Sequence, residues 1–107
     1  ELWHRPGIYI KDIDIIFINR ELSENAKKRV IYHELGHLDH SAELYQNNHT
    51  RCENEANRHM IHKLLEEELA ASDDHKSFNY LQFMQKHKLK TVTDELMVID
   101  EYYELIG

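Results

Sequence analysis

Three residues in one short segment have the types and the spacing of a metal site with an adjacent base. His33, Glu34 and His37 match the pattern H-E-x-x-H within VIYHELGHLDH, residues 30–40. Side chains four residues apart on an α-helix lie one turn apart on the same face, so two imidazoles can bind one zinc ion. The carboxylate of Glu34 lies about 100° around the helix from His33, where it can reach a water molecule at the metal. The pattern predicts His33 and His37 as zinc ligands and Glu34 as general base.

Chance is the competing explanation for this pattern, because the chain contains nine His and many Glu among its 107 residues. A shuffled chain of the same composition would contain the pattern in roughly 9% of cases. The context favours a metal site, since the segment has the apolar periodicity of a helix. Gly36 within a helix costs about 1 kcal/mol relative to Ala. That cost is explained if another element or a metal site crowds the backbone at Gly36.

Two carboxylates of the next helical segment compete for the role of third zinc ligand. Glu53 and Glu55 are two residues apart, so on a helix they point about 160° away from each other. Glu53 falls on the apolar arc beside Met60 and Leu64, and Glu55 falls outside it. A carboxylate on the inward arc needs a compensating partner, and zinc is one. The pattern favours Glu53 as ligand and Glu55 as a surface or pocket-rim residue.

The elements that must position these residues follow from composition and periodicity. GIYIK and DIIFIN are rich in strand-forming residues and predict a small β-ribbon over residues 8–18. Ser23 is a good N-cap for a helix expected from Glu24 to Asp39. SAELYQNNHT is expected to be a connecting loop. Three further helices are predicted over residues 51–71, 78–89 and 93–106.

These elements predict an α+β fold. A small N-terminal β-ribbon or sheet packs on the helix that carries H-E-x-x-H and on a second, ligand-bearing helix, and further helices follow. Residues 1–107 are expected to form a single domain. Within it, residues 1–72 are the zinc-binding catalytic core and residues 73–107 are a C-terminal helical part.

The composition limits the possible partners and compartments. The chain has 31% charged residues and a formal net charge of −7, so neither nucleic acid nor an anionic membrane is an expected partner. No apolar run approaches the roughly 20 residues of a membrane span, and no signal peptide is recognisable. Cys52 is the only cysteine, which favours a reducing compartment. The sequence starts with Glu1 rather than Met, as it would if an N-terminal segment were missing.

Several other polar residues are candidates for supporting roles. His40 is expected to be a surface or helix-end residue, favoured there by the helix dipole. His59 and His62 share a face of the second helix and could edge the cleft. Candidates for stabilising a tetrahedral oxyanion include these two histidines together with Tyr9 and Tyr32.

The combination of motifs resembles the ImmA/IrrE family of metallopeptidases. INRELSENAKKRVIYHELGHLDH is followed by CENEANRHMIHKLL, and the resemblance covers about residues 15–65. It implies a gluzincin-like, cytoplasmic zinc endopeptidase, often encoded by phages, prophages or mobile elements, that cleaves a partner transcriptional repressor. The family pattern E-x-x-A-N begins at Glu53, which supports this residue as ligand. In gluzincins the ligand Glu is typically followed four residues later by an Asp that steadies a ligand His, and here the resemblance places Asn57, a polar group of similar shape, at that position.

Two other functions compete with repressor cleavage. A catalytically silent relative would keep the fold and sequester a repressor or another partner protein without cutting it. A DNA-binding role for the two C-terminal helices is disfavoured, because the last helix carries Asp94, Glu95 and Glu101 and would be repelled by phosphates. The oligomeric state is not predicted by the sequence.

Overall fold

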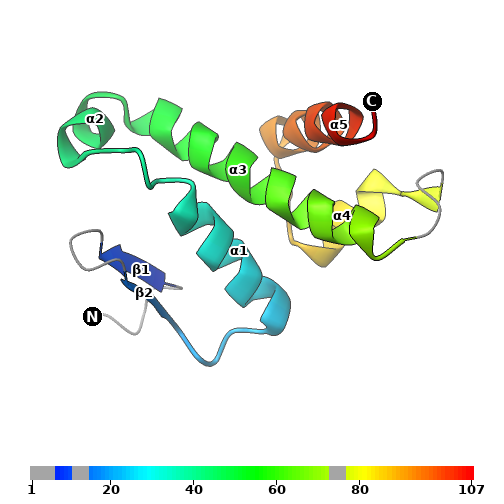
Figure 1. Ribbon diagram of the computed structural model, residues 1–107, viewed down its shortest axis with the longest axis horizontal. Helices are drawn as coiled ribbons and strands as arrows, with labels where there is room; N and C mark the ends of the chain where they lie inside the picture. Colours follow the sequence, from blue (N-terminus) through cyan, green and yellow to red (C-terminus); the bar gives the residue numbers. More distant parts are fainter. Residues whose placement is uncertain (1–6, 11–14, 73–76) are drawn as a thin grey trace. The chain divides into compact units, whose positions relative to one another are not determined.

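The computed structural model describes residues 7–10, 15–72 and 77–107 of the chain (Figure 1). The chain forms two compact units, Glu1–Met60 and Ile61–Gly107. The long helix α3, His49–Ala70, contributes its first half to one unit and its second half to the other. The division thus falls inside a helix, and the expected subdivision at residues 72 and 73 stays a prediction.

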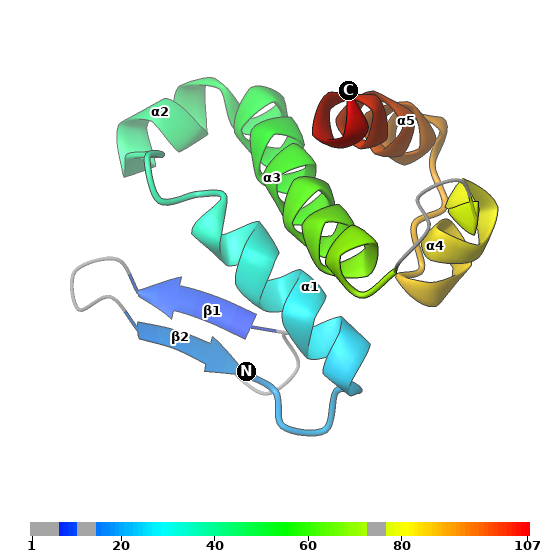
Figure 2. The ribbon, with the colours of Figure 1, turned by 45° about the vertical axis from the view of Figure 1, so that its right-hand side comes forward.

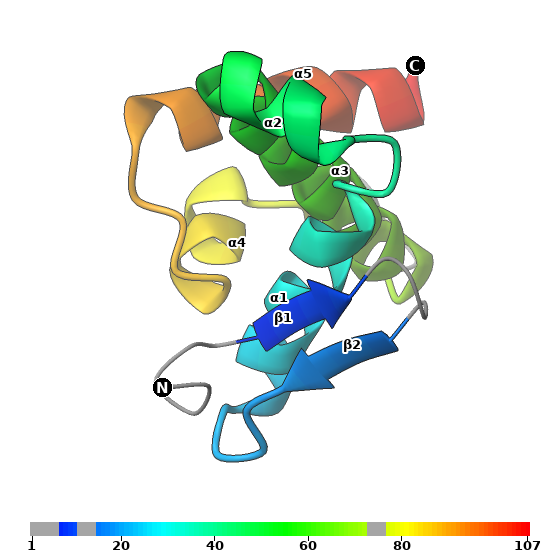
Figure 3. The ribbon, with the colours of Figure 1, turned by 90° about the vertical axis from the view of Figure 1, so that its left-hand side faces the viewer.

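The first unit begins with a short antiparallel hairpin. Strand β1, Gly7–Ile10, pairs with strand β2, Ile15–Ile18, in a register that places Gly7 opposite Ile18. Both strands contact helix α1, Glu24–Leu35, which lies behind the hairpin in Figure 3. A two-stranded hairpin is marginally stable in water, so α1 provides the support that it needs.

The expected α+β class is wrong, because the described part of the chain is predominantly helical. It contains five helices, of 12, 6, 22, 7 and 15 residues, against two strands of four residues each. An N-terminal sheet that could form a layer of the fold is not supported by these described residues. The Ile-rich composition of this segment led to the wrong fold class. Strand propensity predicts where strands form, but it does not supply the further strands that build a sheet.

Helix α1 begins where the sequence predicted and ends earlier. The side chain of Ser23 caps it by accepting a hydrogen bond from the amide of Ala26 at 3.2 Å. The helix ends at Leu35, and residues 36–39 form turns rather than the predicted last helical turn. The amide of His37 donates to the carbonyl of Glu34 at 3.0 Å. This hydrogen bond spans three residues, so the chain tightens after α1 instead of continuing as an α-helix.

The segment expected to be a loop contains helix α2, Ala42–Asn47. Ser41 caps it, since its side chain accepts a hydrogen bond from the amide of Leu44 at 3.0 Å. Glu43 lies in its first turn, where the helix dipole favours a negative charge. The prediction of a loop, which followed from the polar composition of the segment, is therefore wrong for these six residues.

Helix α1 and helix α3 approach each other closely at Gly36 and Ala56 (Figure 2). A Cβ atom added to Gly36 would lie 2.7 Å from Cα of Ala56 and 2.9 Å from its carbonyl oxygen. Ala56 is fully buried. The expectation that another element crowds the backbone at Gly36 is confirmed, because only a residue without a side chain fits against α3 at this position.

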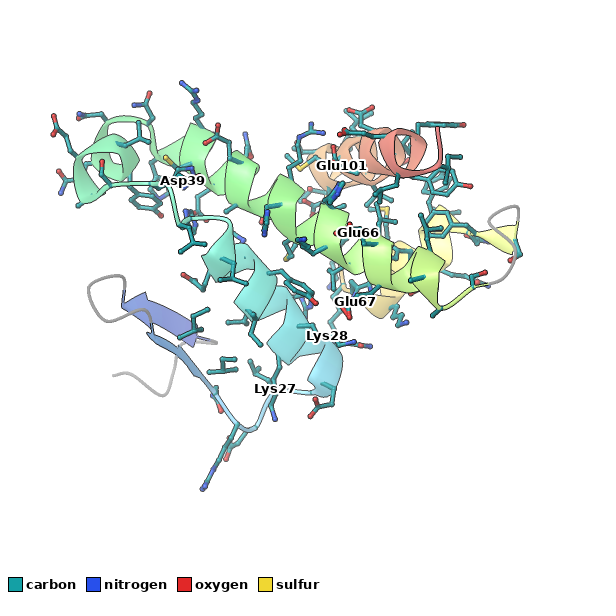
Figure 4. The ribbon with its side chains drawn as sticks, in the orientation of Figure 1. Lys27, Lys28, Asp39, Glu66, Glu67 and Glu101 are labelled. Atoms are coloured by element: carbon teal, nitrogen blue, oxygen red, sulfur yellow. The ribbon has the colours of Figure 1, made fainter. Side chains whose placement is uncertain are left out.

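The second unit contains the end of α3, helix α4, Tyr80–Lys86, and helix α5, Val92–Ile106. Its apolar interior comes from all three helices and includes Ile61, Leu65, Phe83 and Val98. Glu101 of α5 is buried as well, and Figure 4 labels it on that helix. Among the helices that the structure describes, none has the length and apolar character required to cross a membrane.

Replacing Gly36 with Ala tests the close approach of the two helices. Gly36 has φ −65° and ψ −15°, a conformation that Ala adopts without strain, so the backbone itself tolerates the substitution. The added methyl group meets Ala56, and overpacking of this kind costs about 1–3 kcal/mol. We expect the free energy of unfolding in urea to fall by that amount. The exposed Asn54→Ala on α3 is the control, and equal stability of both variants would contradict the steric explanation.

Candidate metal centre

The structure brings His33, His37 and Glu53 together within the first unit. His33 lies in the last turn of α1, His37 in the turn that follows, and Glu53 near the start of α3. Nε2 of His37 lies 2.8 Å from Oε2 of Glu53, and Nε2 of His33 lies 3.3 Å from Oε1. The two imidazole Nε2 atoms are 3.3 Å apart. Three donor atoms from three different positions therefore converge on one point.

This donor set fits a zinc ion. Ligand atoms that bind one zinc at about 2.0–2.2 Å must lie within about 4.4 Å of one another, as these three do. The side chains of His33, His37 and Glu53 are 23%, 15% and 32% exposed, so the site is partly accessible to solvent. Burial lowers the pKa of His37, which favours the neutral imidazole that binds metals. Two His and one Glu leave a fourth position open, as in hydrolytic zinc sites.

Glu34 lies beside these three residues without joining them. It lines the same pocket, but the group of residues that could hold a metal ion consists of His33, His37 and Glu53. Burial raises the pKa of Glu34, His33 opposes that shift, and the negative charge of Glu53 adds to it. A carboxylate with a raised pKa holds a proton more readily, which is the property that a general base requires.

The pocket at this site has a volume of about 410 Å³. It is formed by α1, the following turn and the starts of α2 and α3. The residues that line it are His33, Glu34, His37, His40, Ser41, Ala42, Tyr45 and Glu53. All of them belong to the first unit, so the candidate site is complete within it.

Tyr45 is a residue of the site that the sequence analysis missed. Its hydroxyl donates a hydrogen bond to Oε2 of Glu53 at 3.1 Å, and its oxygen lies 2.7 Å from Nε2 of His49. Burial raises the pKa of the Tyr45 hydroxyl, and Glu53 raises it further, so the group stays protonated and remains a donor. Ser41 followed by Glu43 was the available signal, because it marks the start of a helix that carries Tyr45 to the pocket.

His40 lies closer to the site than the sequence suggested, whereas Glu55, with a side chain that is 50% exposed, agrees with the predicted position at the surface or pocket rim. The side chain of His40 is only 7% exposed, so its expected surface position is wrong. Nδ1 of His40 lies 2.9 Å from Nδ1 of His37, and its Nε2 lies 2.8 Å from Oε1 of Glu55. Asp39, labelled in Figure 4, marks the turn that carries His40. Because this turn is tighter than a helix, it directs His40 back toward His37.

The remaining candidates lie elsewhere. Among the described side chains, Asn57 makes no hydrogen bond with His33, His37 or Glu53, and its steadying role stays a prediction. His62 pairs with Glu101 at 2.9 Å in the second unit. The oxyanion candidates Tyr32, His59 and His62 are not among the described residues that line the pocket. The side chain of Tyr9 lies outside the residues that the structure describes.

A cluster of two His and one Glu beside a further Glu is the arrangement expected of a metallopeptidase, with its ligand candidates on α1, on the turn that follows it and on α3. The family described as the IrrE N-terminal-like domain, a peptidase family, matches residues 2–98. The chain therefore belongs to this family, and the resemblance noted from its motifs is confirmed. No curated protein and no solved structure matches the chain significantly.

Removal of Glu53 tests the metal centre directly. We expect wild-type protein to bind about one zinc ion per chain and Glu53→Ala to lose most of it, because the only carboxylate of the donor set is gone. Native mass spectrometry with added zinc measures the stoichiometry. Zinc should also raise the unfolding temperature of the wild type, since the folded state binds it preferentially. The exposed Glu43→Ala on α2 is the matched control, and full zinc binding by Glu53→Ala would contradict the assignment.

Proposed function

We propose that this protein is a zinc-dependent endopeptidase that cleaves a partner protein, namely a transcriptional repressor of a phage or mobile element. The observation that carries the proposal is the convergence of His33, His37 and Glu53 in one accessible pocket beside Glu34. Membership of a metallopeptidase family supports the hydrolytic reaction. The repressor as substrate rests on the resemblance of the motifs to the ImmA/IrrE family.

Each of these residues in the pocket has a separate role in the proposed hydrolysis. Zinc held by His33, His37 and Glu53 would supply polarisation of the scissile carbonyl and increase the acidity of water. Glu34 takes the proton from the attacking water and then donates it to the leaving amine. Tyr45 holds the Glu53 carboxylate through its hydrogen bond to Oε2.

A protein substrate suits the shape of the site better than a small molecule. The ligand side chains are partly exposed, and the pocket opens at the surface of the first unit rather than enclosing a ligand. An extended peptide could pair with an edge of the β1–β2 hairpin, which belongs to the same unit. Such strand addition supplies backbone hydrogen bonds without requiring a deep cavity. We therefore propose an extended segment of the partner as the part that is cleaved.

Replacing Glu34 with Gln separates catalysis from metal binding. We expect cleavage to fall by at least about 100-fold, because Gln cannot accept the proton of the attacking water. Zinc content should stay at the wild-type level. The pKa of Glu34 is raised in the folded protein, so ionisation of this carboxyl lowers the free energy of unfolding as the pH rises through that pKa. The neutral Gln avoids this cost, and it should therefore not lower the stability of the metal-free protein at neutral pH. Gel-based cleavage assays and zinc content measure both effects, and an active Glu34→Gln would refute the proposed base.

A transcriptional repressor encoded by a gene next to this one would be the first substrate to test. Incubated with zinc-loaded protein, it should be cut at one or a few sites that mass spectrometry can locate. Addition of a zinc chelator should block the cut, and Glu34→Gln is the control for a contaminating protease. A repressor that binds the zinc-loaded protein and remains intact would show a sequestering module instead of a peptidase.

A further inference from the structure

Two hydrogen bonds connect the turn after α1 to α3 behind the metal centre. One joins His37 to His40, with their Nδ1 atoms 2.9 Å apart. The other joins Nε2 of His40 to Oε1 of Glu55, at 2.8 Å. The three side chains therefore form a continuous chain from a carboxylate on α3 to a candidate zinc ligand. The metal binding and the proton transfer by Glu34 proposed above do not involve His40 or Glu55.

The direction of each hydrogen bond follows from the groups involved. The ionised carboxylate of Glu55 can only accept, so Nε2 of His40 carries the proton and donates it. A neutral His40 then has an acceptor at Nδ1, which receives the proton on Nδ1 of His37. With Nδ1 of His37 protonated, its Nε2 atom holds the free electron pair. This Nε2 atom faces Glu53 and His33 in the candidate metal centre.

We propose that Glu55 and His40 are positioning residues that fix the ring orientation and the tautomer of His37 so that its Nε2 atom can bind zinc. The inference rests on the zinc site proposed above. Metal-binding histidines commonly donate their second ring proton to a hydrogen-bond acceptor, which orients the ring and makes it a stronger ligand. Here the acceptor is itself an imidazole that a carboxylate orients in turn.

The surroundings of these three hydrogen-bonded side chains support a role in positioning His37. The side chain of His40 is 7% exposed, whereas that of Glu55 is 50% exposed, so the hydrogen-bonded series runs from the interior to the surface. Arg51 lies one turn before Glu55 on α3 and places its Nε atom 3.6 Å from Oε2.

A second metal site is the competing use of these residues, because His40, Cys52 and Glu55 also lie close together. Cys52 is almost fully buried, and its Sγ atom lies 3.9 Å from the carbonyl oxygen of Leu44. The two ring nitrogens of His40 are already engaged by His37 and Glu55. The geometry therefore favours a hydrogen-bonded chain over a second ion.

Zinc affinity is the readout that tests this inference, measured by competition with a chromophoric chelator. We expect Glu55→Gln and His40→Ala each to weaken zinc binding by about 10–100-fold. The double variant should be no weaker than His40→Ala, because Glu55 acts only through His40. Glu43→Gln, the same chemical change on α2, should leave the affinity unchanged. His40→Asn keeps a polar atom near the position of Nδ1 and should recover part of the loss.

Folding and tautomers distinguish positioning from a general structural effect. Circular dichroism of the zinc-free variants checks folding, and Glu55→Gln, a change at a half-exposed side chain, still tests the inference if His40→Ala fails to fold. In the zinc-loaded protein, long-range ¹H–¹⁵N spectra should show the proton of His40 on Nε2. A proton on Nδ1 of His40 would overturn the inference, and so would two bound zinc ions per chain or wild-type affinity in both single variants. Failure of the wild type to bind zinc would instead overturn the proposed function.

Discussion

The close approach of Gly36 to Ala56 is the contact on which the candidate site depends. It sets the distance between the end of α1 and the second turn of α3 at a value that no larger side chain permits. At this distance the carboxylate of Glu53, one turn before Ala56, reaches the imidazoles of His33 and His37. Two small residues facing each other therefore determine whether the three ligand candidates, from α1, the following turn and α3, can share one ion. The chemistry of the pocket depends on this backbone geometry as much as on the ligands.

The close approach of α1 and α3 also brings together polar groups whose charges repel one another when no cation is bound. Glu34 and Glu53 are carboxylates in one pocket, and each half-buried side chain has lost part of its hydration. Burial and the charge of Glu53 both raise the pKa of Glu34, and burial lowers that of His37. A divalent cation would offset the repulsion and satisfy the donor atoms together. Functional sites often keep such unfavourable arrangements at a cost in local stability, and the charges here are consistent with the proposed metal site.

Much of the candidate site could be predicted from the sequence, because the relevant signals are local. The four-residue spacing of His33 and His37 and the position of Glu53 on the apolar arc depend only on helical periodicity. The fold class could not be read in this way, since it depends on how many strands pair and on tertiary packing. The environment of His40 was missed for a related reason. Its burial follows from the tight turn after α1 and from Glu55, which is 15 residues away in the sequence.

The early end of α1 shows what the H-E-x-x-H spacing requires of the backbone. The pattern assumes one continuous helix, yet His37 lies beyond the last helical residue, Leu35. The two imidazole Nε2 atoms are nevertheless 3.3 Å apart. Gly36 keeps a right-handed helical conformation, so the direction of the chain persists while the hydrogen bonds shorten to a three-residue span. Side chains three residues apart then lie nearly in line, and His40 falls behind His37 instead of turning to the solvent. One tightened turn thus presents His37 to the candidate metal centre and places His40, the residue proposed to orient it, within hydrogen-bonding distance of His37.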